Sequence, residues 1–236
     1  MSDTFQYQTE QFADIKILRY QVPGFEDLSL HQKELIYYLA EAARCGRDIL
    51  FDQNNKNNLS IRRTIEAIVT SYDGDRECEE FKSFIVYTKR VWFSNGIHHH
   101  YSMDKFMPKF SEEYFGELLS NTNHELLPLL KGEDVVGLIS RLVPVLFDEN
   151  VDAKRVVLDP NMDLIQNSAN NYYEGVCEKE VEDFYAKMEK GDSERPISAG
   201  LNSKLVKEDG KLIEKTWKVG GMYTEAIEKI VFWLEK

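Results

Sequence analysis

The sequence predicts an α+β fold that is predominantly helical and has a small antiparallel β component. Three observations lead to this prediction. Apolar residues recur at helical spacing over most of the chain, short β-branched runs lie near both ends, and an Asp209-Gly210 pair separates two such runs. With 236 residues, 42% of them hydrophobic, the chain can bury a substantial core.

The N-terminal part is expected to be a strand followed by helices. Residues 15–22 (IKILRYQV) favour a strand that stops at Pro23-Gly24. Ser29 and Gln32 form a capping box for a long helix. Its apolar stripe consists of Leu35, Ile36, Leu39, Ala42 and Ala43. The next two helices carry apolar residues at helical spacing over Ile61 to Tyr72 and over Phe81 to Trp92.

Further helices are expected after Ser111, over 135–147 with a kink at Pro144, and over 178–190. Composition changes after Pro196, where the Asp-Gly hairpin and a helix from Thr224 follow. We therefore expect a mainly helical part with an N-terminal strand over residues 1–195, and a β-hairpin plus helix over residues 196–236.

Charge and composition argue against two classes of partner. The formal net charge is -12 and basic residues alternate with acids, which argues against nucleic acid. No run approaches the ~20 apolar residues that span a bilayer, and no secretory signal is visible. The three cysteines are far apart, which indicates reduced thiols and a cytoplasmic setting.

No complete catalytic or metal site is recognisable. The His98-His99-His100 run cannot direct three imidazoles at one tetrahedral ion, so a polar loop beside a ligand cleft or a plain surface loop is favoured. His124-Glu125 begins a zinc-protease motif, but Pro128 replaces the second histidine. Residues 167–173 (NSANNYY) fit either a binding loop or a structured turn, and the structural interpretation is favoured.

Four collinear blocks resemble the N-terminal lobe of dipeptidyl peptidase III, a zinc metallopeptidase family, in its bacterial (Bacteroides-type) branch. The blocks are Phe12 to Asn54, Glu80 to Pro108, Asn167 to Val176, and Ile197 to Leu234. The resemblance covers nearly the whole chain. It implies that residues 1–236 are the non-zinc lobe of a two-lobed peptidase, truncated before the second lobe.

That resemblance implies an enzyme that removes dipeptides from the N-terminus of oligopeptides. The chain would form one wall of the peptide cleft, with an oligopeptide substrate and the zinc lobe of the same polypeptide as partners. The family's H-E-x-x-x-H motif is absent, so zinc is expected in the full-length enzyme and none in this chain, which would be inactive alone. Asn95, Gly96, His100 and Tyr101 are the implied substrate-binding residues.

The alternative from another class is a stand-alone, non-catalytic helical protein that binds a partner. It is equally compatible with the missing catalytic motifs. A reading frame that continues into an H-E-x-x-x-H helix would favour the peptidase.

Overall fold

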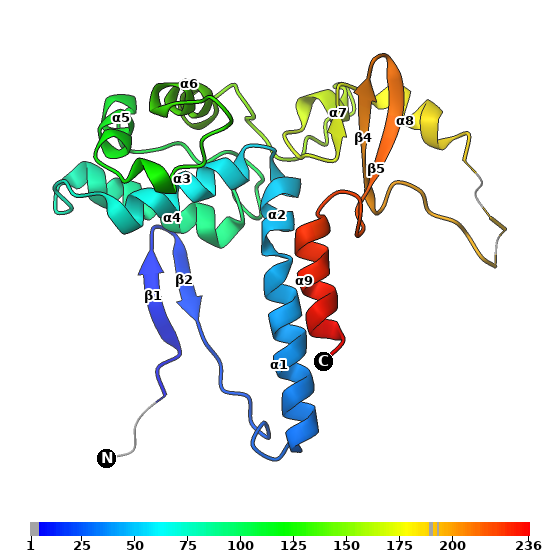
Figure 1. Cartoon of the computed structure of the whole chain (residues 1–236), viewed down its shortest axis with the longest axis horizontal. Coiled ribbons are helices and arrows are strands. Elements are labelled where there is room, and N and C mark those ends of the chain that lie inside the picture. The colour runs from blue at the N-terminus through cyan, green and yellow to red at the C-terminus, as the bar shows by residue number, and fades with distance from the viewer. Residues whose placement is uncertain (1–4, 189–190, 193) are drawn as a thin grey trace.

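The computed structural model describes residues 5–188, 191–192 and 194–236, and its fold is α+β. The main core lies among helices α3 (Asn58–Ser71), α4 (Glu79–Ser94), α5 (Glu112–Ser120) and α6 (Val135–Phe147), with the short 3₁₀ helix η1 (His124–Leu126) beside them (Figure 1). These helices present apolar residues at helical spacing, and the fully buried ones include Ile68, Phe84, Phe115, Leu118 and Leu142.

The N-terminal strand is one arm of a two-stranded antiparallel hairpin. Strand β1 (Gln8–Phe12) pairs with β2 (Ile15–Leu18), so the strand predicted over 15–22 is shorter than expected. The sequence did not indicate β1, because QTEQF is polar and exposed over most of its length. Ion pairs from Lys89 to Glu10 and from Arg90 to Asp14 attach the hairpin to α4.

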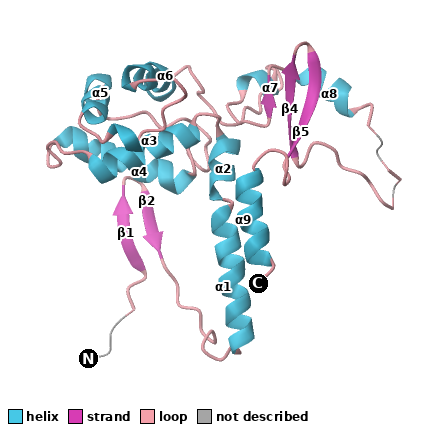
Figure 2. Cartoon of the chain, viewed as in Figure 1, coloured by secondary structure: helices cyan, strands magenta, loops and turns pink. Residues whose placement is uncertain are grey.

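Helix α1 (Leu30–Cys45) projects from the body, and α9 (Thr224–Leu234) lies alongside it (Figures 1 and 2). The Ser29–Gln32 capping box forms as predicted. The apolar stripe of this helix is only partly buried. Ala42 is 3% exposed, whereas Leu35, Ile36 and Leu39 are 58%, 45% and 49% exposed. The contact with α9 includes aromatic rings, such as that of Tyr38, which stacks on Trp233 at a centroid distance of 6.2 Å.

The C-terminal hairpin forms at the predicted turn and joins a three-stranded sheet. Strand β4 (Ser203–Glu208) pairs with β5 (Lys211–Thr216) in antiparallel fashion and with β3 (Tyr173–Glu174) in parallel. The sheet is therefore mixed. The predicted small antiparallel component is present in the β1–β2 and β4–β5 pairs. Asp209 and Gly210 both have positive φ, as a tight hairpin turn requires.

Two short helices, α7 (Leu164–Asn167) and α8 (Glu178–Tyr185), accompany this sheet. Helix α8 ends before the predicted residue 190, and residues 189 and 190 lie outside the described part of the chain. Strand β3 precedes residue 195 and β4 follows it, so the sheet contains strands from both sides of the predicted domain boundary. The division of the chain into two parts stays a prediction. Among the described residues, no helix has the length and apolarity to cross a bilayer.

Candidate ligand-binding pocket

The turn after helix α2 (Arg47–Asn54) organises the contact between the helical body and the small sheet. Asn55 is buried there, and its side-chain amide donates to Asp152 Oδ2 at 2.8 Å and to the Ala169 carbonyl at 3.2 Å. The Asn55 amide oxygen accepts from the Asn57 backbone at 2.8 Å. One asparagine thus joins three segments that are far apart in sequence, because its amide both donates and accepts.

A second asparagine fixes the segment that leads into β3. The Asn171 backbone donates to the Gln53 carbonyl at 2.9 Å, and its side chain donates to Asp52 Oδ2 at 3.1 Å. Lys204 is buried on β4, donates to Asn171 Oδ1 at 2.7 Å and forms an ion pair with Glu174. The hydrogen bond from Lys204 lowers the pKa of the Glu174 carboxyl.

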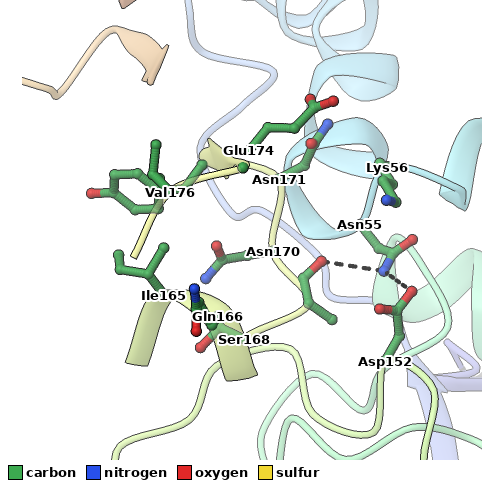
Figure 3. Close-up of a pocket in the computed structure, with 13 residues that line it drawn as sticks. Asn55, Lys56, Asp152, Ile165, Gln166, Ser168, Asn170, Asn171, Glu174 and Val176 are labelled. Carbon is green, nitrogen blue, oxygen red and sulfur yellow. Dashed lines mark hydrogen bonds between the residues drawn. The ribbon is translucent and has the colours of Figure 1, made fainter. Parts of the chain in front are cut away.

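A cavity of about 450 Å³ opens between these segments (Figure 3). Asn55 and Lys56, Asp152, and most of the run 165–176 line it. Its volume is within the range typical of small-molecule pockets, roughly 300–1,000 Å³. Figure 3 shows the side chains of Gln166, Ser168 and Asn170 gathered on the side opposite Lys56. We call this cavity the amide pocket.

Several polar groups of the amide pocket have no protein partner among the described residues. The side-chain amides of Gln166 and Asn170 make no hydrogen bond there, and Lys56 forms no salt bridge. Ser168 Oγ accepts from the Val157 backbone at 2.9 Å, which leaves its hydroxyl hydrogen to donate. The pocket therefore offers unpaired donors and acceptors, one cation, and the carboxylates of Asp152 and Glu174, as recognition of a polar ligand requires.

The predicted substrate residues Asn95 and Gly96 have structural roles in the fold. Asn95 ends α4 with a left-handed backbone, φ 52°, and its carbonyl accepts from the Asn54 side chain at 3.0 Å. Gly96 is buried with φ 144°, and an added Cβ would lie 2.1 Å from Asn58 Nδ2. Only glycine fits so close to another side chain at this backbone angle.

The histidine run forms a tight, internally bonded loop. His99 Nδ1 accepts from the backbone amides of Tyr101 and Ser102, both at 3.1 Å. His98 is buried with Nε2 2.7 Å from the Asp152 carbonyl, and burial lowers the pKa of its imidazole. Two buried imidazole nitrogens of this loop, His98 Nδ1 and His100 Nδ1, have no hydrogen-bond partner among the described residues.

His100 and Tyr101 lie outside the amide pocket. The His100 ring packs against His99 at a centroid distance of 4.5 Å, and desolvation lowers the pKa of its imidazole. Tyr101 is 82% exposed. None of Asn95, Gly96, His100 and Tyr101 lines the amide pocket, and their part in substrate binding stays a prediction.

Within residues 5–188, 191–192 and 194–236, no three His, Cys, Asp or Glu side chains cluster as a metal site would require. The expectation of zinc elsewhere in a longer protein is untested and stays a prediction.

Sequence reasoning identified only part of the amide pocket. Residues 167–173 were recognised as a candidate binding loop, although the structural interpretation was favoured. Asn55 and Asp152 were missed, because nothing in a single sequence indicates that they meet across 97 positions. The available signal was the amide-rich run QNNKNN at residues 53–58, which begins in the last turn of α2.

Comparison with known proteins identifies a similar RNA-modifying enzyme. No family model matches the chain. A tRNA (cytidine(56)-2'-O)-methyltransferase from Methanococcus maripaludis (strain C6 / ATCC BAA-1332) is 31% identical over 128 residues. The match covers 51% of this chain and 64% of the relative, so the chain spans less than two thirds of that protein's length.

This match contradicts the expected membership in dipeptidyl peptidase III. The same match overturns three further predictions: the metallopeptidase activity, the oligopeptide substrate, and the zinc lobe as a partner. The match gives the alternative, a non-catalytic helical protein, no better support. The exclusion of nucleic acid is corrected as well, because the relative is named for a tRNA nucleotide. Net charge is a sum over the chain, whereas recognition of one nucleotide depends on a few local groups.

Proposed function

We propose that this chain is part of an RNA-modifying protein and that the amide pocket binds one ribonucleoside of the RNA. The observation that carries the proposal is the pair of unpaired amides, Gln166 and Asn170, in a cavity that also holds the unpaired Lys56. The partial similarity to an enzyme named for a tRNA cytidine supports RNA as the ligand class.

The chemistry of the pocket suits a nucleoside. An Asn or Gln side chain presents one donor and one acceptor in a plane, which matches the adjacent donor and acceptor on a base edge. Tyr173 also lines the cavity, and aromatic rings stack on unpaired bases with a contribution of about 1–3 kcal/mol. A ribose hydroxyl can donate to the Asp152 carboxylate, one oxygen of which already accepts from Asn55.

Lys56 gives the pocket a place for one phosphate. Its side chain is exposed and forms no salt bridge with a described carboxylate, although its charge helps to lower the pKa of the neighbouring Glu174 carboxyl. A single local cation can hold one phosphate even though the chain as a whole carries a net charge of -12. The acidic surface would repel the rest of a long RNA, so we expect recognition of one exposed nucleotide. Because only one phosphate is contacted, the affinity should depend weakly on salt.

The proposal assigns recognition to this chain and no step of methyl transfer. Methyl transfer to a tRNA ribose is the activity in the relative's name. The residues around the amide pocket supply hydrogen bonds, one cation and an aromatic ring, all of which orient a nucleotide.

The test is a calorimetric titration of the purified chain with cytidine 5'-monophosphate, its 2'-deoxy form and an unmodified tRNA transcript. We expect saturable binding of cytidine monophosphate and tRNA. Weaker binding of the deoxy form would indicate that the pocket forms a hydrogen bond with the 2'-hydroxyl. Asn170→Ala and Gln166→Ala should each weaken binding by about tenfold, the effect of losing a ligand hydrogen bond of roughly 1.4 kcal/mol.

Asn161→Ala is the matched control, because this exposed asparagine bonds only within its own turn to Asp159. It should leave the affinity unchanged. Absence of saturable binding by both the nucleotide and the tRNA would overturn the proposal, and so would equal affinities for the wild type and both pocket variants.

A further inference from the structure

A second hollow, distinct from the amide pocket, lies along α4. Its volume is about 310 Å³. The α4 residues that line it recur one helical turn apart, at Lys82, Val86 and Arg90. The β1–β2 turn at Ala13 and the segment that includes Met107 and Lys109 provide the remaining walls. We call this hollow the α4 groove.

The charge of the α4 groove is opposite to that of the chain. Its lining contains three cations, Lys82, Arg90 and Lys109, and no carboxylate, in a chain whose net charge is -12. Lys82 and Arg90 each reach one carboxylate outside the lining, at 2.9 Å and 2.6 Å. Lys109 forms no ion pair with any residue that the structure describes. One positive charge is therefore left without a counter-charge at the mouth of the groove.

The groove also has an apolar floor. Val86 is 36% exposed and Met107 43% exposed, so both present aliphatic surface to a ligand. The Tyr87 side chain lines the same hollow and is 4% exposed, and its hydroxyl has no hydrogen-bond partner in the described structure. That hydroxyl is sealed from solvent, so a ligand seated in the groove would not reach it.

We propose that the α4 groove binds a small organic carboxylate with an apolar body. The carboxylate would accept charge-assisted hydrogen bonds from Lys109 and from the free N–H groups of Arg90. The apolar body would cover Val86 and Met107 and the alkyl stems of the lysines. An alkyl acid and an aryl acid share this chemistry. The inference is independent of the nucleoside proposal, because the groove and the amide pocket share no lining residue.

The test uses octanoate and 2-naphthoate as probes of the full chain, with chemical-shift perturbation to locate binding and calorimetry to measure it. Octanamide keeps the apolar body without the charge. We expect saturable binding of at least one acid, with shifts at α4 and residues 107–109, and about tenfold weaker binding of octanamide. Preference between the two acids distinguishes an alkyl from an aryl ligand.

Two variants probe the two halves of the site. Lys109→Glu reverses the unpaired charge, and Val86→Asp places an anion on the apolar floor. Both positions are exposed, so the fold should be retained, as circular dichroism would verify. Each should reduce the affinity for the acids by about tenfold or more. Lys131→Glu makes the same charge change at an exposed position outside the groove and should have no effect.

The proposal would be overturned if neither acid binds saturably, or if both groove variants bind them as the wild type does. Shifts confined to the exposed apolar residues of α1 and α9 would overturn it too.

Discussion

The Tyr223 hydroxyl donates a hydrogen bond of 2.6 Å to Asp52 Oδ2, and so joins residues 171 positions apart. Asp52 lies in the last turn of α2 and also accepts from Asn171, while Tyr223 directly precedes α9. One carboxylate thus connects the helical body, the approach to β3 and the final helix. Burial, and after it the bond to Asp52, raises the pKa of the Tyr223 hydroxyl.

Tyr223→Phe should lower the free energy of unfolding by about 1–2 kcal/mol, because it removes one hydrogen bond to a charged acceptor and little packing. Denaturant unfolding followed by circular dichroism would measure the loss. Tyr20→Phe is the control, since Tyr20 is 72% exposed and has no hydrogen bond through its hydroxyl within the described structure. Equal losses in the two variants would contradict the role given to the Tyr223–Asp52 bond.

Gly96→Ala should destabilise the protein, whereas Tyr101→Ala should change the free energy of unfolding by less than about 0.5 kcal/mol. The added methyl at Gly96 would lie 2.1 Å from Asn58 Nδ2, at a backbone angle that alanine rarely adopts. Asn58 cannot move freely, because it bonds to the Phe51 carbonyl at 3.0 Å and the Ile97 amide at 3.2 Å. Thermal denaturation of both variants provides the measurement, and an unchanged midpoint for Gly96→Ala would refute the close approach.

The ion pair of Glu133 with Arg141 should make stability depend on acid pH. Two hydrogen bonds from Arg141, at 2.8 and 2.9 Å, and one from the Leu130 amide lower the pKa of the Glu133 carboxyl from 4.5 to about 2. A depressed folded-state pKa stabilises the fold above the unfolded value and loses this contribution as the pH falls through the folded value. We therefore expect a loss of stability between about pH 4.5 and pH 2 from this group.

Glu133→Gln provides the measurement for this pair. Its unfolding free energy should be lower than that of the wild type at pH 7, and the difference should shrink as the pH approaches 2. A difference that stays constant from pH 7 to pH 2 would show that titration of Glu133 contributes nothing.

Leu142→Ala should reduce the free energy of unfolding by about 2–5 kcal/mol, because it leaves a cavity in the main core. Leu142 is fully buried on α6 among the residues of that core. Leu130→Ala makes the same change at a position that is 57% exposed and should cost far less. Chemical denaturation would compare the two, and similar losses would contradict the placement of the core on this face of α6.

Much of the local structure follows from short-range patterns in the sequence. The Ser29–Gln32 box, the Ser111 cap and the Asp209-Gly210 turn were all predicted, because each depends on hydrogen bonds or backbone angles within a few residues. The helical spacing of apolar residues also predicted α3 and α4, and both helices are present. Strand β1 was not, since polar residues pair there through backbone groups that carry no side-chain signal.

The sequence by itself determined the helical character, one N-terminal strand, the C-terminal hairpin and the absence of familiar catalytic motifs. Only the tertiary structure decided which apolar stripe is buried, as the exposed Leu35 and Leu39 of α1 demonstrate. It also decided that Asn55, Asp152 and Asn170 border one cavity. It likewise placed Asn95 at the left-handed end of α4 and Gly96 against the side chain of Asn58. The physical reason is range: caps and turns depend on neighbours in the chain, whereas pockets depend on packing between distant segments.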